Sequence, residues 1–397
     1  MSLSAASPAE RTTWLVLVAI SLCHMINDIM QSLLAALYPL LALEFDLSFW
    51  QIGLMTFAFQ VTASLLQPLV GLVTDRRPMP QSLPVGMGST ICGLILLAYA
   101  SSYGGLLTGA MLIGIGSAIF HPESSRVARL ASGGKFGTAQ SLFQVGGNFG
   151  SALGPLLAAF IVVPLGRPSV AVFAVLALLG MFILNRVGVW YGALARASAG
   201  RPRESATHGL PRNRVIWAIV VLAVLTFSKN AYTASISSYY TFFLIDRFDL
   251  GIVPAQQMLF LFLAATAAGV MLGGVIGDRF GPLVVIWASI LGVLPFTLML
   301  PHVGLVATGV MSVVIGVIIA SAFPAIVVYA QMLLPGRIGL VAGIFFGFAF
   351  GMGGIAAAVL GVMADARGIA WVYQACAFLP LLGVLTVFLP RRALLTP

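Results

Sequence analysis

The segment Gly71-Leu-Val-Thr-Asp75-Arg76 decides the fold, because it returns further along the chain as Gly274-Val-Ile-Gly-Asp278-Arg279. Phe45-Asp46-Leu47 returns in the same way as Phe248-Asp249-Leu250, and both repeats have an offset of 203 residues. That offset is about half of the 397-residue chain, so the sequence predicts two structurally equivalent halves fused in tandem. Duplicated hydrophobic halves are a common construction of secondary transporters.

The composition places this chain in a membrane. Charged residues make up 8% of it and hydrophobic residues 60%, whereas charged residues are roughly 25% of an ordinary soluble domain. Apolar stretches long enough to cross a hydrocarbon core of about 30 Å recur along the whole sequence. We predict an all-α integral membrane protein with twelve transmembrane helices, over residues 14–40, 50–73, 83–100, 104–125, 138–163, 169–191, 215–243, 255–276, 283–300, 303–329, 338–363 and 370–389.

The longest polar stretch separates the sixth predicted span from the seventh and is rich in Arg, Ser, Ala and Gly. It predicts a cytoplasmic linker over 193–213 between two pseudo-symmetric six-helix bundles, over 1–192 and 214–397. The first hydrophobic run is too long for a signal peptide and lacks a basic segment before it, so we expect it to be retained.

The basic residues predict the orientation. Sixteen of the twenty lie in segments that are cytoplasmic if the N-terminus is cytoplasmic, as the positive-inside rule requires. We therefore expect both termini in the cytoplasm. The same rule accounts for the net charge of +9, so we expect no nucleic-acid partner. The three cysteines lie within spans without ligand spacing, and we expect no metal site and no cofactor.

The first span carries a polar stripe. His24, Asn27, Asp28 and Gln31 follow each other at helical spacing and share one face. An ionised Asp near the bilayer centre costs about 2.5–3.5 kcal/mol, so Asp28 must line a cavity, pair with a base or be protonated. His24 lies one turn away, and we predict that this pair carries a proton. The alternative is a structural His–Asp hydrogen bond that fixes two helices.

The fourth span ends with further ionisable residues, His121, Glu123 and Arg126. Glu123 and Arg126 have the spacing of a helical ion pair, and we include His121 and Glu123 among the proton-coupling residues. Arg126 either faces a cavity or extends to the lipid headgroups. The corresponding stretch of the second half, around Pro324, lacks these charges, so we expect proton coupling to belong to the first half.

The seventh span holds an intramembrane cation, Lys229, which shares a helical stripe with Tyr232 and with Tyr239 or Tyr240. A cation among tyrosines can hold an anionic or aromatic group, although an ion pair with Asp28 is an equally open interpretation. Polar residues of the fifth span extend the polar surface. The predicted substrate site comprises Asn27, Gln31, Arg126, Gln144, Asn148, Lys229, Asn230, Tyr232 and Tyr239.

Two motifs resemble signatures of the major facilitator superfamily. The repeated loop is similar to the superfamily's GxxxDR motif, and the resemblance implies a cytoplasmic gate made by Gly71, Asp75, Arg76, Gly274, Asp278 and Arg279. Gly150-Ser-Ala-Leu-Gly154-Pro155 is similar to the antiporter motif of drug-exporting members. Small residues at this spacing are also generic packing faces of membrane helices, so the motif has this second interpretation.

Several stretches together resemble the fosmidomycin-resistance family of that superfamily: His24-x-x-Asn27-Asp28, Asp75-Arg76-Arg77-Pro78, Phe120-His121-Pro122-Glu123, and Gln140 to Asn148 running into Gly154-Pro155. The resemblance implies a proton-driven exporter of drugs or small metabolites in a bacterial inner membrane. A proton-coupled importer of a metabolite or nutrient is the alternative.

The expected partners are a small-molecule substrate, protons and the lipid bilayer, and we expect a monomer. Lys229 suits a Schiff base in a retinal protein, but a duplicated twelve-span chain without catalytic motifs predicts neither a receptor nor an enzyme.

Overall fold

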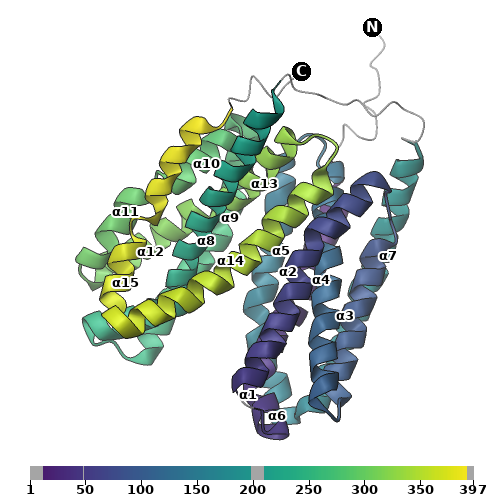
Figure 1. Cartoon of the computed structure of the whole chain (residues 1–397), viewed down its shortest axis with the longest axis horizontal. Helices are drawn as coiled ribbons and strands as arrows, with labels where there is room; N and C mark the ends of the chain where they lie inside the picture. Colours follow the sequence, from purple (N-terminus) through teal and green to yellow (C-terminus); the bar gives the residue numbers. More distant parts are fainter. Residues whose placement is uncertain (1–11, 48, 198–209, 391–397) are drawn as a thin grey trace. The chain divides into compact units, whose positions relative to one another are not determined.

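The structure is a computed structural model that describes residues 12–47, 49–197 and 210–390. All regular elements of these residues are helical, and they form twelve segments long and apolar enough to span a membrane (Figure 1). The prediction of an all-α membrane protein with twelve spans is confirmed.

Contacts between residues divide the chain into two compact units. The first contains Met1–Ser205 together with Gly336–Gly347, and the second contains Ala206–Pro335 and Phe348–Pro397. The sequence did not anticipate that the first turns of α14 (Ile338–Arg367) belong to the first unit. The predicted linker over 193–213 includes residues 198–209, which lie outside the described residues, and the boundaries at 192 and 214 stay predictions.

The first unit is built around two packed groups of helices. α1 (Trp14–Phe45) lies along α5 (Phe136–Leu157), while α4 (Tyr103–Ala131) packs against α2 (Phe49–Arg76) and α3 (Ser82–Tyr99). α3 in turn contacts α7 (Val170–Ala197), and the connection from α5 to α7 is made by η2 (Ala158–Val162), α6 (Val163–Leu165) and η3 (Arg167–Ser169).

Small residues set the distance between α1 and α5. A Cβ atom added at Gly146, Gly150 or Gly154 would collide with α1 at Ser21, Met25 or Ser32 respectively. These glycines therefore let the two helices approach closely, which is how membrane helices maximise their contact. Two residues of the predicted antiporter motif, Gly150 and Gly154, thus make the α1–α5 contact, and the third, Pro155, lies inside α5 just before the π-helical turn η2.

The second unit contains α8 (Arg212–Phe248) and α9 (Ile252–Phe280), with Tyr232, Tyr240, Phe243 and Tyr373 in its buried core. Three of its spans are interrupted where the sequence analysis expected single helices. Residues 283–300 form α10 (Pro282–Ile290), α11 (Leu294–Met299) and the start of η4 (Leu300–His302); residues 303–329 form α12 (Leu305–Ala320) and α13 (Ala322–Leu333); the last span forms α15 (Ile369–Cys376) and the 3₁₀ helix η5 (Leu379–Phe388).

A proline follows each of these interruptions at a similar spacing. A proline has no N–H to donate to the carbonyl four residues earlier, so a helix tends to end there. Pro324 lies four residues after the end of α12, and Pro380 lies four residues after the end of α15. Pro295 has the same relation to Leu291, the residue that follows α10.

The repeated Phe-Asp-Leu segments have a common structural role. Asp46 and Asp249 end α1 and α8 with left-handed backbone angles, φ 49° and 51°, and are the two non-glycine residues with positive φ in the described part of the chain. Each backbone N–H bonds the carbonyl four residues earlier, that of Ala42 or Ile245. Aspartate tolerates this conformation better than most residues, so both halves end their first helix in the same way.

Candidate functional site

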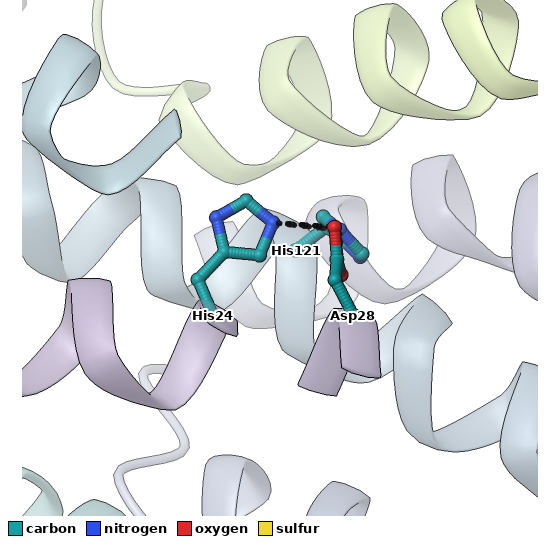
Figure 2. Close-up of side chains that lie close together, drawn as sticks. All are labelled: His24, Asp28 and His121. Atoms are coloured by element: carbon teal, nitrogen blue, oxygen red, sulfur yellow. Dashed lines mark hydrogen bonds and ion pairs between the residues drawn. The ribbon is translucent and has the colours of Figure 1, made fainter. Parts of the chain in front are cut away.

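Three ionisable side chains meet inside the first unit (Figure 2). α1 supplies His24 and Asp28, one turn apart, and α4 supplies His121. Nε2 of His24 lies 3.5 Å from Oδ2 of Asp28, and Nε2 of His121 lies 3.7 Å from Oδ1. The two Nε2 atoms are 3.2 Å apart. All three residues are buried, with at most 5% of their surface exposed.

The packing of α1, α4 and α5 fixes both imidazole rings. Nδ1 of His24 donates to the carbonyl of Phe143 at 2.7 Å, and Nδ1 of His121 donates to that of Ser117 at 2.9 Å. His24 also stacks on the Phe143 ring, with centroids 4.0 Å apart, while Phe346 packs against both histidines. Such backbone partners on one ring nitrogen determine what the other nitrogen can do.

Asp28 is surrounded by neutral donors. Oδ1 accepts from Asn27 at 3.1 Å and from Gln31 at 2.8 Å, and Oδ2 accepts from Ser151 at 3.4 Å. Among the described residues of the first unit, the two histidines are the only bases within ion-pair distance of this carboxylate. A buried acid without a permanent cation is an unusual and costly arrangement in a membrane, so Asp28 is a candidate for a functional role.

One nitrogen or oxygen atom from each of the three residues lies within 4.8 Å of the other two, so one small cation could contact all three residues. His24 and Asp28 are neighbours on one helix, as the sequence analysis expected. His121 comes from another helix, and its contact with them depends on how α1 packs against α4.

Glu123 and Arg126 form a second buried cluster instead of joining the first. Nη1 of Arg126 lies 3.3 Å from Oε1 of Glu123 and 3.2 Å from the hydroxyl of Tyr191. Arg126 also donates to Oγ1 of Thr74 at 3.0 Å, to the Thr74 carbonyl, and to Asp75. The guanidinium is therefore enclosed by polar groups of the protein. A role for Arg126 in binding substrate stays a prediction.

The first copy of the repeated motif ties α2 to the start of α14. Oδ1 of Asp75 accepts from the backbone N–H of Gly339 at 2.9 Å, and Oδ2 accepts from that of Leu340 at 2.8 Å. A carboxylate at this position satisfies free N–H groups and complements the helix dipole. A Cβ atom added at Gly71 would collide with the backbone of Gly339, and one added at Gly339 would collide with Nη2 of Arg126.

The other predicted gate residues lie at helix ends. Arg76 is exposed at the end of α2. In the second copy Gly274 is buried in α9, Asp278 is half-buried, and the exposed Arg279 lies 5.3 Å from the ring centre of Phe280. A gating role for the six residues stays a prediction.

The predicted substrate residues fall into separate places. Gln144 donates to Asn148, one turn away, at 3.2 Å. In the second unit, Nζ of Lys229 donates to Oδ1 of Asn230 at 3.2 Å and lies 5.7 Å from the ring centre of Phe323. No carboxylate among that unit's described residues lies within ion-pair distance of Lys229.

Tyr232 is packed in the core of the second unit, where the partly buried Tyr239 packs against it. The assignment of these residues to a substrate site stays a prediction.

Sequence reasoning missed several polar residues of the two clusters. Ser117 precedes His121 by one helical turn, and Thr74 lies inside the repeated motif, so the sequence alone could have predicted that both lie near the site. Ser82 lies 3.4 Å from Oε2 of Glu123, and Tyr191 contacts Arg126 from α7. Neither of these has a signal in the sequence, because both come from other helices.

Comparisons with known proteins agree with this architecture. Residues 20–358 match the model of the Major Facilitator Superfamily. The chain is 58% identical to the fosmidomycin resistance protein of Escherichia coli K12, over 98% of this chain and 95% of that protein. It is 42% identical to an uncharacterised transporter of the same superfamily from Bacillus subtilis 168, over 96% of this chain and 93% of that protein.

A solved structure shares the fold. The crystal structure of FucP, a transporter of the superfamily, in its outward conformation superposes with a TM-score of 0.75 at 17% identity, over 96% of this chain and all of that one. These proteins are transporters and not enzymes. The chain belongs to the Major Facilitator Superfamily, and within it to the fosmidomycin-resistance family of multi-pass membrane transporters.

Proposed function

We propose that this transporter exports small anionic compounds, drugs among them, in exchange for protons. The observation that carries the proposal is the buried trio of His24, Asp28 and His121 inside a membrane-spanning unit. A site of this kind can gain and lose a proton, because it is built from titratable side chains. Its burial makes each charge state costly, so a change of state is linked to conformation.

The anionic character of the substrate is supported by Lys229. Its ammonium group lies within a span, has an amide oxygen as its hydrogen-bond partner, and has no carboxylate within ion-pair distance among the described residues of its own unit. The amide nitrogen of Asn230 is buried and unbonded among the described residues, so it is a second available donor. The related protein from E. coli is named for resistance to fosmidomycin, and we propose this compound as a substrate here.

The proposed mechanism is alternating access. Protonation of the trio and binding of the anion would favour different conformations, so that the entry of protons is coupled to the export of the anion. The tie between Asp75 and the start of α14 would stabilise one of these conformations, as a gate element. The protein would act in the bacterial inner membrane, as a monomer with both termini in the cytoplasm.

A test uses purified protein in proteoliposomes with an imposed pH gradient and labelled fosmidomycin. Asp28→Asn keeps the size of the side chain and removes its charge, and we expect it to abolish gradient-driven transport. Asp46→Asn is the matched control, because Asp46 is exposed at the end of α1 and Asn accepts its backbone conformation. Undiminished gradient-driven transport by Asp28→Asn would refute the proposal.

A further inference from the structure

The hydrogen bonds around the two histidines fix where their protons lie. A backbone carbonyl only accepts, so the contacts of His24 with the Phe143 carbonyl and of His121 with the Ser117 carbonyl require a proton on each Nδ1. In a neutral imidazole the other nitrogen is then a bare acceptor. Both Nε2 atoms would therefore be acceptors, and they face each other at 3.2 Å (Figure 2).

A chain of hydrogen bonds supports this assignment for His121. The hydroxyl of Ser117 also lies 3.2 Å from Nδ1 of His121, but it donates to Oε1 of Gln31 at 2.9 Å. Gln31 in turn donates through Nε2 to Asp28. The hydroxyl proton of Ser117 is therefore donated to Gln31, so the proton in the hydrogen bonds of His121 Nδ1 must be bound to that nitrogen.

Two acceptor lone pairs at hydrogen-bond distance repel each other, so a cation must lie between them. The total charge indicates which cation. Asp28 is the one carboxylate that faces the pair from α1, and Glu123 of α4 pairs with Arg126. Neither α5 nor the described part of α14 in this unit, residues 338–347, contains an ionisable residue.

One proton beside one carboxylate leaves the cluster neutral. A divalent metal ion at the same place would leave a net positive charge buried in the membrane, which is far costlier. We propose that His24 and His121 share a single proton between their Nε2 atoms, and that Asp28 stays ionised as its counter-ion. The imidazole pair, and not the carboxylate, then takes up and releases the coupled proton; this rests on the proposed proton exchange.

The proton balance links the pair to helix packing. Uptake forms one N–H bond on Nε2 of one ring, and the partner Nε2 accepts its hydrogen bond. Release breaks that N–H bond, so two neutral imidazoles face each other beside an uncompensated carboxylate. The contact between α1 and α4 then changes from attractive to repulsive.

The packing of α5 against the two histidines limits how far their imidazole rings can rotate. A Cβ atom at Gly147 of α5 would lie 2.9 Å from Oδ2 of Asp28 and would collide with the His24 ring. His24 is also held by its stacking on Phe143. The rings therefore have little room to turn away from each other, and deprotonation favours separation of the helices.

The test is nitrogen-15 NMR of protein labelled only at histidine, in lipid nanodiscs without substrate or gradient. The chain has four histidines, so the spectrum is simple. We expect His24 and His121 to titrate together, with a proton coupled to both Nε2 atoms in the low-pH form. His24→Gln should abolish this coupling and change the titration of His121, whereas His302→Gln, at an exposed position of η4, should leave both unchanged.

Carbon-13 labelling of aspartate adds a readout that needs no variant. We expect the Asp28 carboxyl to remain ionised while the histidines titrate. A protonated Asp28 beside two neutral histidines would overturn the proposal, and so would histidine signals that respond to a metal chelator but not to pH. If the parent protein shows proton-coupled transport but no shared-proton signal, only this inference is contradicted. If it shows the shared proton but no proton-coupled transport, only the proposed function is contradicted.

Discussion

Asp75→Asn tests the link between α2 and the start of α14. The carboxylate of Asp75 accepts from two backbone N–H groups, those of Gly339 and Leu340, and from the guanidinium of Arg126. Asparagine has one acceptor oxygen, so at least one of the N–H groups loses its partner. Removal of a helix cap costs about 1 kcal/mol, and loss of the charge at a helix N-terminus costs about 0.3–1 kcal/mol more.

The ion pair adds to this loss. Breaking a buried pair costs roughly 3–5 kcal/mol when the remaining charge has no partner, but Arg126 keeps Glu123 at 3.3 Å, so the cost here is smaller. We expect a total of about 2–4 kcal/mol. Since a tenfold change corresponds to about 1.4 kcal/mol, hydrogen exchange at the backbone of Gly339 and Leu340 should accelerate roughly 30-fold or more.

The assay is hydrogen–deuterium exchange by mass spectrometry on peptides that contain the start of α14, together with the thermal unfolding midpoint in detergent. Asp46→Asn should leave both readouts unchanged. Exchange at Gly339 and Leu340 that is equal in Asp75→Asn and in the parent protein would refute the reasoning, because the two bonds to Asp75 would then contribute nothing to the stability of this helix end.

Three further predictions have definite expected outcomes. Gly147→Ala should lower the free energy of unfolding by about 1–3 kcal/mol, because the added methyl group overlaps the His24 ring. The control is Gly88→Ala in α3, where a methyl group has room and should change the free energy of unfolding by nothing or raise it by up to about 1 kcal/mol. Equal shifts of the unfolding midpoint for the two variants would contradict the account. Asp249→Val should destabilise by about 1–2 kcal/mol, since a β-branched residue resists left-handed backbone angles, and a valine variant as stable as a glycine variant would show this wrong. Lys229→Ala should weaken the binding of fosmidomycin at least about tenfold in a ligand thermal-shift titration, because a charged hydrogen bond contributes about 1.5–3 kcal/mol; unchanged binding would remove Lys229 from the substrate site.

Much of the fold was predictable because its signals are local. Apolar length alone predicts the spans, and the repeats predict the tandem halves. The interruptions of the later spans were readable in principle, because Pro324 and Pro380 each lie four residues beyond the end of a helix. The hydrophobicity of these spans is continuous, so it predicts an uninterrupted helix in each.

The candidate site also contains some contacts that local sequence spacing predicts and others that it does not. Helical periodicity places His24 and Asp28 on one face, as expected from their spacing. It says nothing about His121, whose contact with His24 depends on how α1 packs against α4. The partners of Arg126 likewise depend on tertiary packing, because α2 and α7 supply them.

The central claim is an exchange of protons for an anion, and the most direct measurement follows pH inside proteoliposomes loaded with fosmidomycin. With no imposed pH gradient, outward flow of the compound should carry protons inward and acidify the lumen, and Asp28→Asn should abolish this signal. A lumen that becomes alkaline would show that protons and substrate move in the same direction. A lumen whose pH does not change while the compound leaves would contradict proton coupling altogether.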